Sequence, residues 1–342
     1  MHLLVIRTSA MGDVALTTPV ITALRKKYPD TSVTLVTRTS FTPFFASISG
    51  LQLFTADFNG RHKGLAGIFR LYSELRKQAK IDHVIDLHDV LRSKILSWFF
   101  RISGIPVSVI DKGRAEKTEV IKGKNRLRLR HTVERYCDVF AKAGFPFIPE
   151  TGVSIMPSPE AIDKISGLPL SMSVTDIGVA PYAKHKLKMW PEENMVKLLK
   201  VITEKHEVKL WLFGGAEETE RLISLQSNLP GSYVVAGKLS LSEELALMGR
   251  LDLMISMDSS NMHMAALCGT KVISIWGGTD PVTGFGAWQQ PDDYSISIPQ
   301  DELTCRPCTI FGKEKCRRGD LACMHWLTPE KVYEKLINLK IL

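Results

Sequence analysis

The sequence predicts an α/β protein made of two doubly wound domains, each built on a parallel sheet. The chain has 342 residues, about two domains at roughly 150 residues each. Short apolar, β-branched runs alternate with helical patterns along the chain, which is typical of parallel sheets covered on both faces. The alternation restarts after 146–169, a passage that contains five prolines and has the composition of a linker. We therefore place the domains at 1–160 and 161–342.

The first domain is expected to contain four strands and four helices in alternation. Its strands are short runs rich in Val, Ile and Leu, and its helices are the longer segments between them. The expected strands are 3–7, 33–37, 84–87 and 107–110, and the expected helices are 13–27, 65–79, 91–101 and 132–143.

The second domain repeats this alternation and ends on a further helix after Thr328-Pro329-Glu330, which could pack back on the first domain. The expected strands are 177–180, 208–213, 233–236, 253–256 and 272–276, and the expected helices are 192–205, 217–227, 242–250 and 260–268. Ligands of such sheets bind outside the carboxyl ends of the strands. We therefore expect the site in the loops that follow the strands, in a cleft between the domains.

The composition indicates a cytoplasmic protein with one basic half. Hydrophobic residues make up 44% and charged residues 23% of the chain, and six cysteines are too few for a disulfide scaffold. The apolar N-terminal run is broken at Arg7, so it does not resemble a signal peptide. Residues 1–170 hold 25 Lys/Arg against 15 Asp/Glu, net +10, whereas residues 171–342 hold 19 against 21, net −2. The first half is expected to face something anionic.

Common nucleotide-binding motifs do not occur in this sequence. The turn after the first strand has one glycine where a dinucleotide fingerprint has three, and Gly231…Gly237-Lys238 is followed by Leu239 where a P-loop needs Ser or Thr. Dehydrogenase and P-loop NTPase functions are therefore disfavoured, as are the common hydrolases.

The turn after the first strand carries Ser9-Ala10-Met11-Gly12-Asp13. Gly12 would allow a tight or left-handed turn. Asp13 stands where the next helix begins, so it is either a helix cap or a carboxylate held at the mouth of the sheet as a general base. The residues alone leave both roles open.

Two further strand ends carry candidate phosphate-binding residues. Lys184, Lys186 and Lys188 precede a helix that starts near Pro191, and they are either a diphosphate clamp or a solvated basic loop. After the strand at 253–256, the chain reads Asp258-Ser259-Ser260-Asn261-Met262-His263. Small hydroxyl residues at a helix start can offer N–H and O–H groups to phosphate. Trp276-Gly-Gly-Thr-Asp-Pro281 forms a glycine-rich turn after the following strand.

Taken in order, S-x-x-G-D, K-x-W-P, D-S-x-x-x-H and G-x-T-D-P resemble the ADP-heptose:lipopolysaccharide heptosyltransferases of glycosyltransferase family 9. This resemblance covers residues 3 to about 330 and implies the GT-B fold. It implies inverting, metal-independent transfer of heptose from ADP-heptose to Kdo or heptose of the lipopolysaccharide inner core. No cofactor is required, and the enzyme would work in the cytoplasm, with peripheral contact to the inner membrane.

The resemblance also assigns roles to residues. Asp13 would be the general base, and Ser9 and Gly12 would frame the reacting centre. Donor-binding roles fall on one lysine and on the loop after the strand at 253–256: Lys188, Asp258, Ser259, Ser260 and His263. The sequence departs from the family at Pro181, where glycine is usual, and at Ser259-Ser260, where Thr-Gly is common. No acidic residue for the ribose is evident before Lys238.

Residues 112–131 are strongly basic, with eight Lys/Arg against Glu116 and Glu119. Through the resemblance, Arg126, Arg128 and Arg130 would bind the anionic inner-core acceptor; otherwise the segment is a solvated loop. Nucleic acid is not expected, because no aromatic platform stands among these charges.

Other functions stay open. A glycosyltransferase with another nucleotide sugar or acceptor is one, and a non-catalytic nucleotide-sugar-binding protein is another. Four cysteines near the end of the chain could ligate zinc, as paired thiolates do, or pack as a reduced loop: Cys305, Cys308, Cys316 and Cys323. We expect the metal-free alternative.

Overall fold

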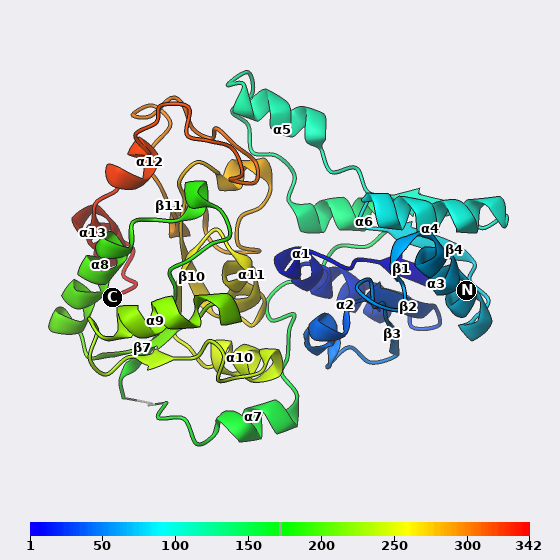
Figure 1. The fold of residues 1–342 in the computed structure, drawn as a ribbon, viewed down its shortest axis with the longest axis horizontal. Helices are drawn as coiled ribbons and strands as arrows, with labels where there is room; N and C mark the ends of the chain where they lie inside the picture. Colours follow the sequence, from blue (N-terminus) through cyan, green and yellow to red (C-terminus); the bar gives the residue numbers. More distant parts are fainter. Residues whose placement is uncertain (171–172) are drawn as a thin grey trace. The chain divides into compact units, whose positions relative to one another are not determined.

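The computed structural model describes all residues except 171 and 172. The chain divides into two compact units. Unit 1 consists of Met1–Gly113 and Arg130–Met156, and unit 2 consists of Arg114–Leu129 and Pro157–Leu342. Each unit is a parallel sheet with helices packed on it (Figure 1). The predicted fold class, two doubly wound α/β domains, is confirmed.

Unit 1 is built on a five-stranded sheet in the order β3-β2-β1-β4-β5. The paired strands are parallel, and β1 lies between β2 and β4. The strands are β1 (His2–Ile6), β2 (Ser32–Thr37), β3 (Leu51–Thr55), β4 (His83–Asp86) and β5 (Val107–Val109). The helices are α1 (Met11–Ala15), α2 (Thr18–Lys27), α3 (Gly64–Gln78), α4 (Leu91–Ile102) and α6 (Thr132–Lys142), with a 3₁₀ segment η1 (Thr39–Phe45).

Helices α3 and α4 pack against each other and against the sheet of unit 1. Their inward side chains, among them Ile68, Leu71 and Phe100, join Leu4 and Val84 of the strands in one buried cluster. The spacing of the inward residues along α3 follows the helical period, so burial of one face holds the helix in place.

Unit 2 is built on a six-stranded parallel sheet in the order β11-β10-β9-β6-β7-β8. The strands are β6 (Thr175–Ala180), β7 (Val208–Leu212), β8 (Tyr233–Val234), β9 (Leu253–Met257), β10 (Lys271–Ile275) and β11 (Ser295–Ile296). The helices are α5 (Arg114–Ile121), α7 (Pro159–Ile165), α8 (Glu192–Lys205), α9 (Thr219–Gln226), α10 (Leu241–Met248), α11 (Ser260–Leu267), α12 (Ala322–His325) and α13 (Pro329–Asn338). Its described residues also form the 3₁₀ turns η2 (Lys186–Lys188), η3 (Ala216–Glu218), η4 (Pro281–Thr283) and η5 (Asp292–Tyr294).

Several elements differ from the sequence-based predictions. The single helix expected at 13–27 is two helices, α1 and α2. Strand β3 was not predicted, because its sequence LQLFT lacks a β-branched run. Helix α7 lies inside the expected linker, where Ser158 accepts from the Ala161 N–H and Pro159 occupies the first helical turn.

The last helix packs within unit 2. Val332 and Leu336 of α13 are fully buried in the hydrophobic cluster of unit 2, and α13 contacts α8. These contacts anchor the last helix on unit 2.

Most of the basic segment 112–131 belongs to unit 2, although its residue numbers fall within the range 1–160 predicted for the first domain. Residues 114–129 cluster with unit 2, and the Leu129 N–H donates to the Val282 carbonyl at 2.8 Å. No helix in the described part of the chain is long and apolar enough to span a bilayer.

Candidate active site

The turn after β1 holds Asp13 against a buried cation. Asp13 lies in the first turn of α1, and its Oδ2 accepts from the Ala10 N–H at 3.3 Å. The same oxygen pairs with Nη2 of Arg7 at 2.8 Å, and the Asp13 side chain stays 22% exposed. Asp13 is therefore not the N-cap itself: it reaches back from the third helical position to the backbone of the N-cap residue Ala10, and it also presents a carboxylate partly to solvent.

Arg7 is enclosed by unit 1. Its Nη1 donates to the Leu87 carbonyl at 2.5 Å, and its guanidinium lies over the Tyr136 ring at 5.6 Å. Burial, the largest single influence, disfavours the charge on Arg7, but Asp13, Tyr136 and Asp86 together raise the pKa of Arg7. The cation and the carboxylate hold each other in place, while Tyr136 donates its hydroxyl to the Asp13 backbone carbonyl at 3.2 Å.

His88, which no sequence motif singled out, lies beside this turn. Its Nε2 is 3.1 Å from the Ser9 hydroxyl and its Nδ1 is 3.1 Å from the Thr8 hydroxyl. Burial, followed by the positive charges of Arg7 and Lys112, lowers the pKa of His88 to about 3. A neutral imidazole therefore fixes the Ser9 side chain. The polar pair His88-Asp89 after a strand was a signal that could have identified it.

The predicted residues Ser9 and Gly12 both lie at this turn. Ser9 is half-buried, and its hydroxyl contacts His88. Gly12 is buried inside α1. It has no left-handed backbone, so the left-handed turn allowed for it does not form.

In unit 2, three loops from neighbouring strands meet at the carboxyl edge of the sheet. Lys188, in η2 after β6, places Nζ 2.8 Å from Oδ2 of Asp258, which follows β9. The Thr279 hydroxyl, after β10, donates to the same oxygen at 2.8 Å. Because β10, β9 and β6 are adjacent and parallel, their ends bring these residues together. Lys184 and Lys186 are exposed, so the structure singles out Lys188 among the three lysines.

The glycine-rich turn is packed closely against the Lys188 loop. A Cβ on Gly277 would lie 2.9 Å from the Leu187 carbonyl oxygen, and the Gly278 N–H donates to this oxygen at 2.9 Å. The absence of side chains at both positions allows this approach.

A buried arginine from the cysteine-rich tail holds the same turn. Arg306 donates to the carbonyls of Gly277 at 2.9 Å and of Thr279 at 3.1 Å, and it pairs with Asp280 at 3.3 Å. Arg306 was not predicted as a functional residue, because the pattern of cysteines around it gives no sign of its partners. Burial lowers the pKa of Arg306, against the opposing effect of Asp280.

The remaining predicted donor residues lie at the start of α11. Ser259 precedes the helix with its hydroxyl 3.3 Å from that of Ser256, and Ser260 begins the helix. His263 is buried one turn later, with its ring facing Phe285 edge-on at 6.4 Å. The free N–H groups of α11 thus begin directly after Asp258, which suits an anion.

The loop after β7 adds carboxylates at this edge. Glu217 and Glu218 form η3, and Glu218 accepts from the Gly215 N–H at 2.8 Å. Strand β7 pairs with β6, so this loop lies at the same edge as Lys188. The Phe213-Gly214-Gly215 turn was an available signal for it.

The three predicted acceptor arginines have different surroundings. Arg128 pairs with Asp292 within unit 2. Arg130 pairs with Asp138 within unit 1 at 2.7 Å. Arg126 is exposed.

The four cysteines of the tail are reduced, and burial raises the pKa of Cys323 to about 11. Cys308 also lies 3.6 Å from the Gly278 carbonyl. Among the residues that the structure describes, no group of three or more His, Cys, Asp or Glu side chains is arranged to hold a metal.

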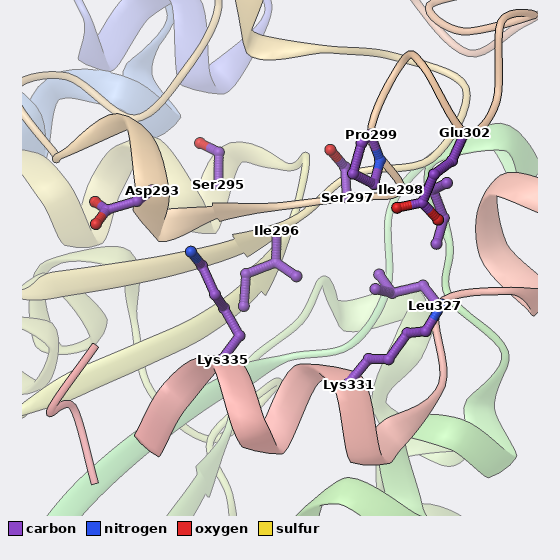
Figure 2. A pocket seen from close by; sticks show the side chains of 10 residues that line it. All are labelled: Asp293, Ser295, Ile296, Ser297, Ile298, Pro299, Glu302, Leu327, Lys331 and Lys335. Carbon is purple, nitrogen blue, oxygen red and sulfur yellow. The ribbon is translucent and has the colours of Figure 1, made fainter. Parts of the chain in front are cut away.

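A cavity of about 330 Å³ lies elsewhere in unit 2, between β11 and α13. Figure 2 shows two lysines of α13, Lys331 and Lys335, on one side of it and Asp293 and Glu302 among its other lining residues. The mixed charges do not favour a diphosphate, and none of the predicted donor residues lines this cavity.

Comparison with known families decides what kind of protein carries these residues. The model of "Glycosyltransferase family 9 (heptosyltransferase)" matches residues 68–309, more than half of the chain. The chain belongs to glycosyltransferase family 9. It is a glycosyltransferase of the heptosyltransferase family, as the sequence motifs implied.

Relatives of this glycosyltransferase match it over most of its length. It is 25% identical to lipopolysaccharide heptosyltransferase 1 of Pseudomonas aeruginosa, covering 98% of this chain and 97% of the relative. It is also 25% identical to lipopolysaccharide heptosyltransferase 3 of Escherichia coli K12, covering 79% and 81%.

Solved structures of family 9 share the fold. A family 9 glycosyltransferase from Veillonella parvula has a TM-score of 0.79 at 21% identity, covering 99% of this chain and 96% of that one. The E. coli heptosyltransferase WaaC, solved with ADP, has a TM-score of 0.69 at 19% identity, covering 100% of both chains. These likenesses support the GT-B fold.

The buried imidazole of His88 should make the stability of this glycosyltransferase depend on pH. In the unfolded chain a histidine takes up a proton near pH 6.5, whereas His88 in the folded chain stays neutral down to about pH 3. Between these values the unfolded state binds more protons, so the free energy of unfolding should fall as the pH decreases. We expect His88 to contribute a loss of about 1–2 kcal/mol between about pH 7 and pH 5.

Urea unfolding at several pH values, compared between wild type and His88→Gln, checks this expectation. The free energy of unfolding of His88→Gln should fall less between pH 7 and pH 5 than that of wild type. His325→Gln, which changes an exposed histidine, should show the same dependence on pH as wild type. Equal slopes in wild type and His88→Gln would contradict a buried neutral His88.

Proposed function

We propose that this enzyme transfers a heptose from ADP-heptose to the inner core of lipopolysaccharide, with inversion of the anomeric centre and without a metal. One observation carries the proposal. The chain is a member of family 9, and its Asp13 places a partly exposed carboxylate after the first strand. The relatives named as lipopolysaccharide heptosyltransferases and the solved structure with ADP support the choice of donor and acceptor.

In the proposed reaction Asp13 is the general base. The acceptor hydroxyl gives its proton to the Asp13 carboxylate while its oxygen forms a bond to the anomeric carbon of the heptose. The bond from that carbon to the diphosphate breaks, and ADP leaves with the electron pair from the opposite face. Arg7 and the Ala10 N–H hold the carboxylate in one orientation, and Ser9, fixed by His88, lines the same turn.

On the donor side, Lys188 and the start of α11 are proposed to receive the diphosphate. The leaving group develops negative charge, which a cation and backbone N–H groups stabilise. Asp258 holds Lys188 in place until the diphosphate competes for it, and Ser259, Ser260 and His263 stand at the same helix start. Glu217 and Glu218 are the carboxylates proposed for the ribose hydroxyls, as acidic residues serve in other doubly wound domains.

The proposed acceptor is an anionic glycolipid. Kdo carboxylates and phosphates would bind the basic segment. Among the three arginines, exposed Arg126 is the first candidate for this contact, because Arg128 and Arg130 are engaged in ion pairs. Such an acceptor places the enzyme in the cytoplasm, in peripheral contact with the inner membrane.

Product analysis tests the function as a whole. The purified chain is incubated with inner-core acceptors that end in Kdo or heptose and with a panel of nucleotide sugars, with and without EDTA. We expect heptosylated product from ADP-heptose alone, unaffected by EDTA and with inverted configuration by NMR. Transfer from another nucleotide sugar would overturn the choice of ADP-heptose as donor. Donor binding without any transfer would favour a non-catalytic binding protein.

Asp13→Asn should separate catalysis from capping. The amide keeps an oxygen for the Ala10 N–H but cannot accept the acceptor's proton, so kcat should fall by roughly 10²–10⁴-fold. The variant also leaves buried Arg7 without its carboxylate, so some loss of stability is expected. Steady-state transfer is measured well below the melting temperature of the variant, with ADP affinity alongside.

Asp57→Asn is the matched control for this experiment. Asp57 is exposed and accepts from the N–H groups of Asn59, Gly60 and Arg61, so it is an aspartate with a purely local role in the same unit. Its variant should keep full turnover. Near-normal turnover by Asp13→Asn would return Asp13 to the capping role.

Lys188→Ala should weaken ADP binding by about 10- to 100-fold, as expected for loss of one sheltered charged contact. Calorimetric titration with ADP measures this, and Lys186→Ala is the control, since Lys186 is exposed on the same loop. If Lys186→Ala weakens binding and Lys188→Ala does not, the diphosphate has been assigned to the wrong lysine.

A further inference from the structure

The outer surfaces of α3 and α4 carry large apolar side chains that the core of unit 1 does not use. Their exposed fractions lie between 53% and 75%. We call these residues the α3–α4 face, and they are Leu65, Phe69, Leu91, Trp98 and Ile102. A helix on the surface of a soluble domain normally has polar residues on this side.

The spacing of these residues makes one continuous face. Leu65 and Phe69 are four apart on α3, and Leu91, Trp98 and Ile102 are seven and four apart on α4, so each helix presents one stripe. The two helices pack side by side (Figure 1). The ring of Phe99 joins the stripes, because it lies 5.3 Å from the rings of both Phe69 and Trp98.

The segment that carries this face is rich in cations. Residues 61–102 contain nine Lys/Arg and four Asp/Glu, a net charge of +5. Exposed cations stand on or directly before the two helices, at Lys63, Arg70, Arg76, Lys77, Arg92, Lys94 and Arg101. Lys94 pairs with Asp89 at 3.2 Å.

The four carboxylates in this stretch all have partners or are buried. Glu74 pairs with Arg61 and His62, Asp89 pairs with Lys94, Asp82 accepts from the His2 N–H, and Asp86 is buried. The field around the apolar residues is therefore positive.

An apolar face on helices that also carry exposed cations fits an anionic bilayer. Tryptophan places its ring among lipid headgroups, and Lys and Arg reach anionic phosphates while their stems cover apolar surface. A second copy of the chain is a poorer partner, since a symmetric contact would set like charges against each other.

We propose that the α3–α4 face docks the enzyme on the surface of an anionic phospholipid membrane. The choice of a bilayer rests on the proposed function, because the acceptor there is a glycolipid. Docking brings the enzyme to a membrane-bound acceptor without taking part in the transfer itself.

Vesicle sedimentation tests docking without donor or acceptor. Wild type should bind vesicles of phosphatidylethanolamine with phosphatidylglycerol, bind pure phosphatidylcholine more weakly, and lose binding as salt is raised. Phe69→Gln/Leu91→Gln/Trp98→Gln should reduce binding at least tenfold. The matched control, Ile148→Gln/Ile162→Gln/Ile223→Gln, changes exposed apolar residues elsewhere and should bind as wild type does. Arg70→Gln/Arg101→Gln tests the charges independently and should weaken binding to the anionic vesicles.

Transfer assays distinguish a failure of docking from a failure of the proposed function. The apolar triple variant should glycosylate a water-soluble, delipidated acceptor at the wild-type rate but act more slowly on acceptor in vesicles. If no transfer occurs but vesicle binding is lost in the variant, docking stands and the function fails. Unchanged vesicle binding in the variants overturns docking. If wild type self-associates in sedimentation velocity and the apolar triple variant loses self-association but not vesicle binding, the face binds a second copy of the chain and docking is overturned as well.

Discussion

A buried cation costs several kcal/mol unless oxygens surround it, and this constraint shapes both candidate sites. In unit 1 the Arg7 side chain is 5% exposed and needs Asp13 and the Leu87 carbonyl. In unit 2 the Arg306 side chain is 1% exposed and needs Asp280 and the carbonyls of the glycine-rich turn. That turn carries Thr279, which donates to Asp258. Each arginine thus fixes a turn on which a proposed functional residue depends.

Parallel strand pairing explains why residues distant in sequence share a site. All strands of a parallel sheet end at one edge, so the order of strands decides which loops are neighbours. In unit 1, β1 and β4 are adjacent, which brings His88 to Ser9 across 79 residues. In unit 2, β6 lies beside β9, which brings Lys188 to Asp258. The chemistry of each site is therefore set by strand order as much as by the local motifs.

The sequence identified the local parts of this arrangement and missed the long-range ones. Asp13, Lys188 and Asp258 lie in the segments that follow apolar strands, so the sequence marked them as candidates, and the family resemblance gave them roles. His88 and Arg306 gain their roles from partners that only the strand order and the path of the tail provide. The break between α1 and α2 was hidden by a continuous helical pattern. The basic residues at 114–129 could be seen in the sequence, but not their attachment to unit 2 through Leu129 and Val282.

The pairing of Arg7 with Asp13 also bears on how the proposed base would be reset. When Asp13 takes up the acceptor's proton, Arg7 loses its ion-pair partner and keeps the Leu87 carbonyl, the face of the Tyr136 ring and the charge of Asp86. A buried cation in that state is unfavourable, so the pair favours prompt release of the proton. Because the Asp13 side chain is 22% exposed, the proton can pass to water. The neutral imidazole of His88, with both nitrogens engaged by Thr8 and Ser9, is poorly placed to receive it. In the proposed reaction, Arg7 therefore orients the base before transfer and restores its charge afterwards.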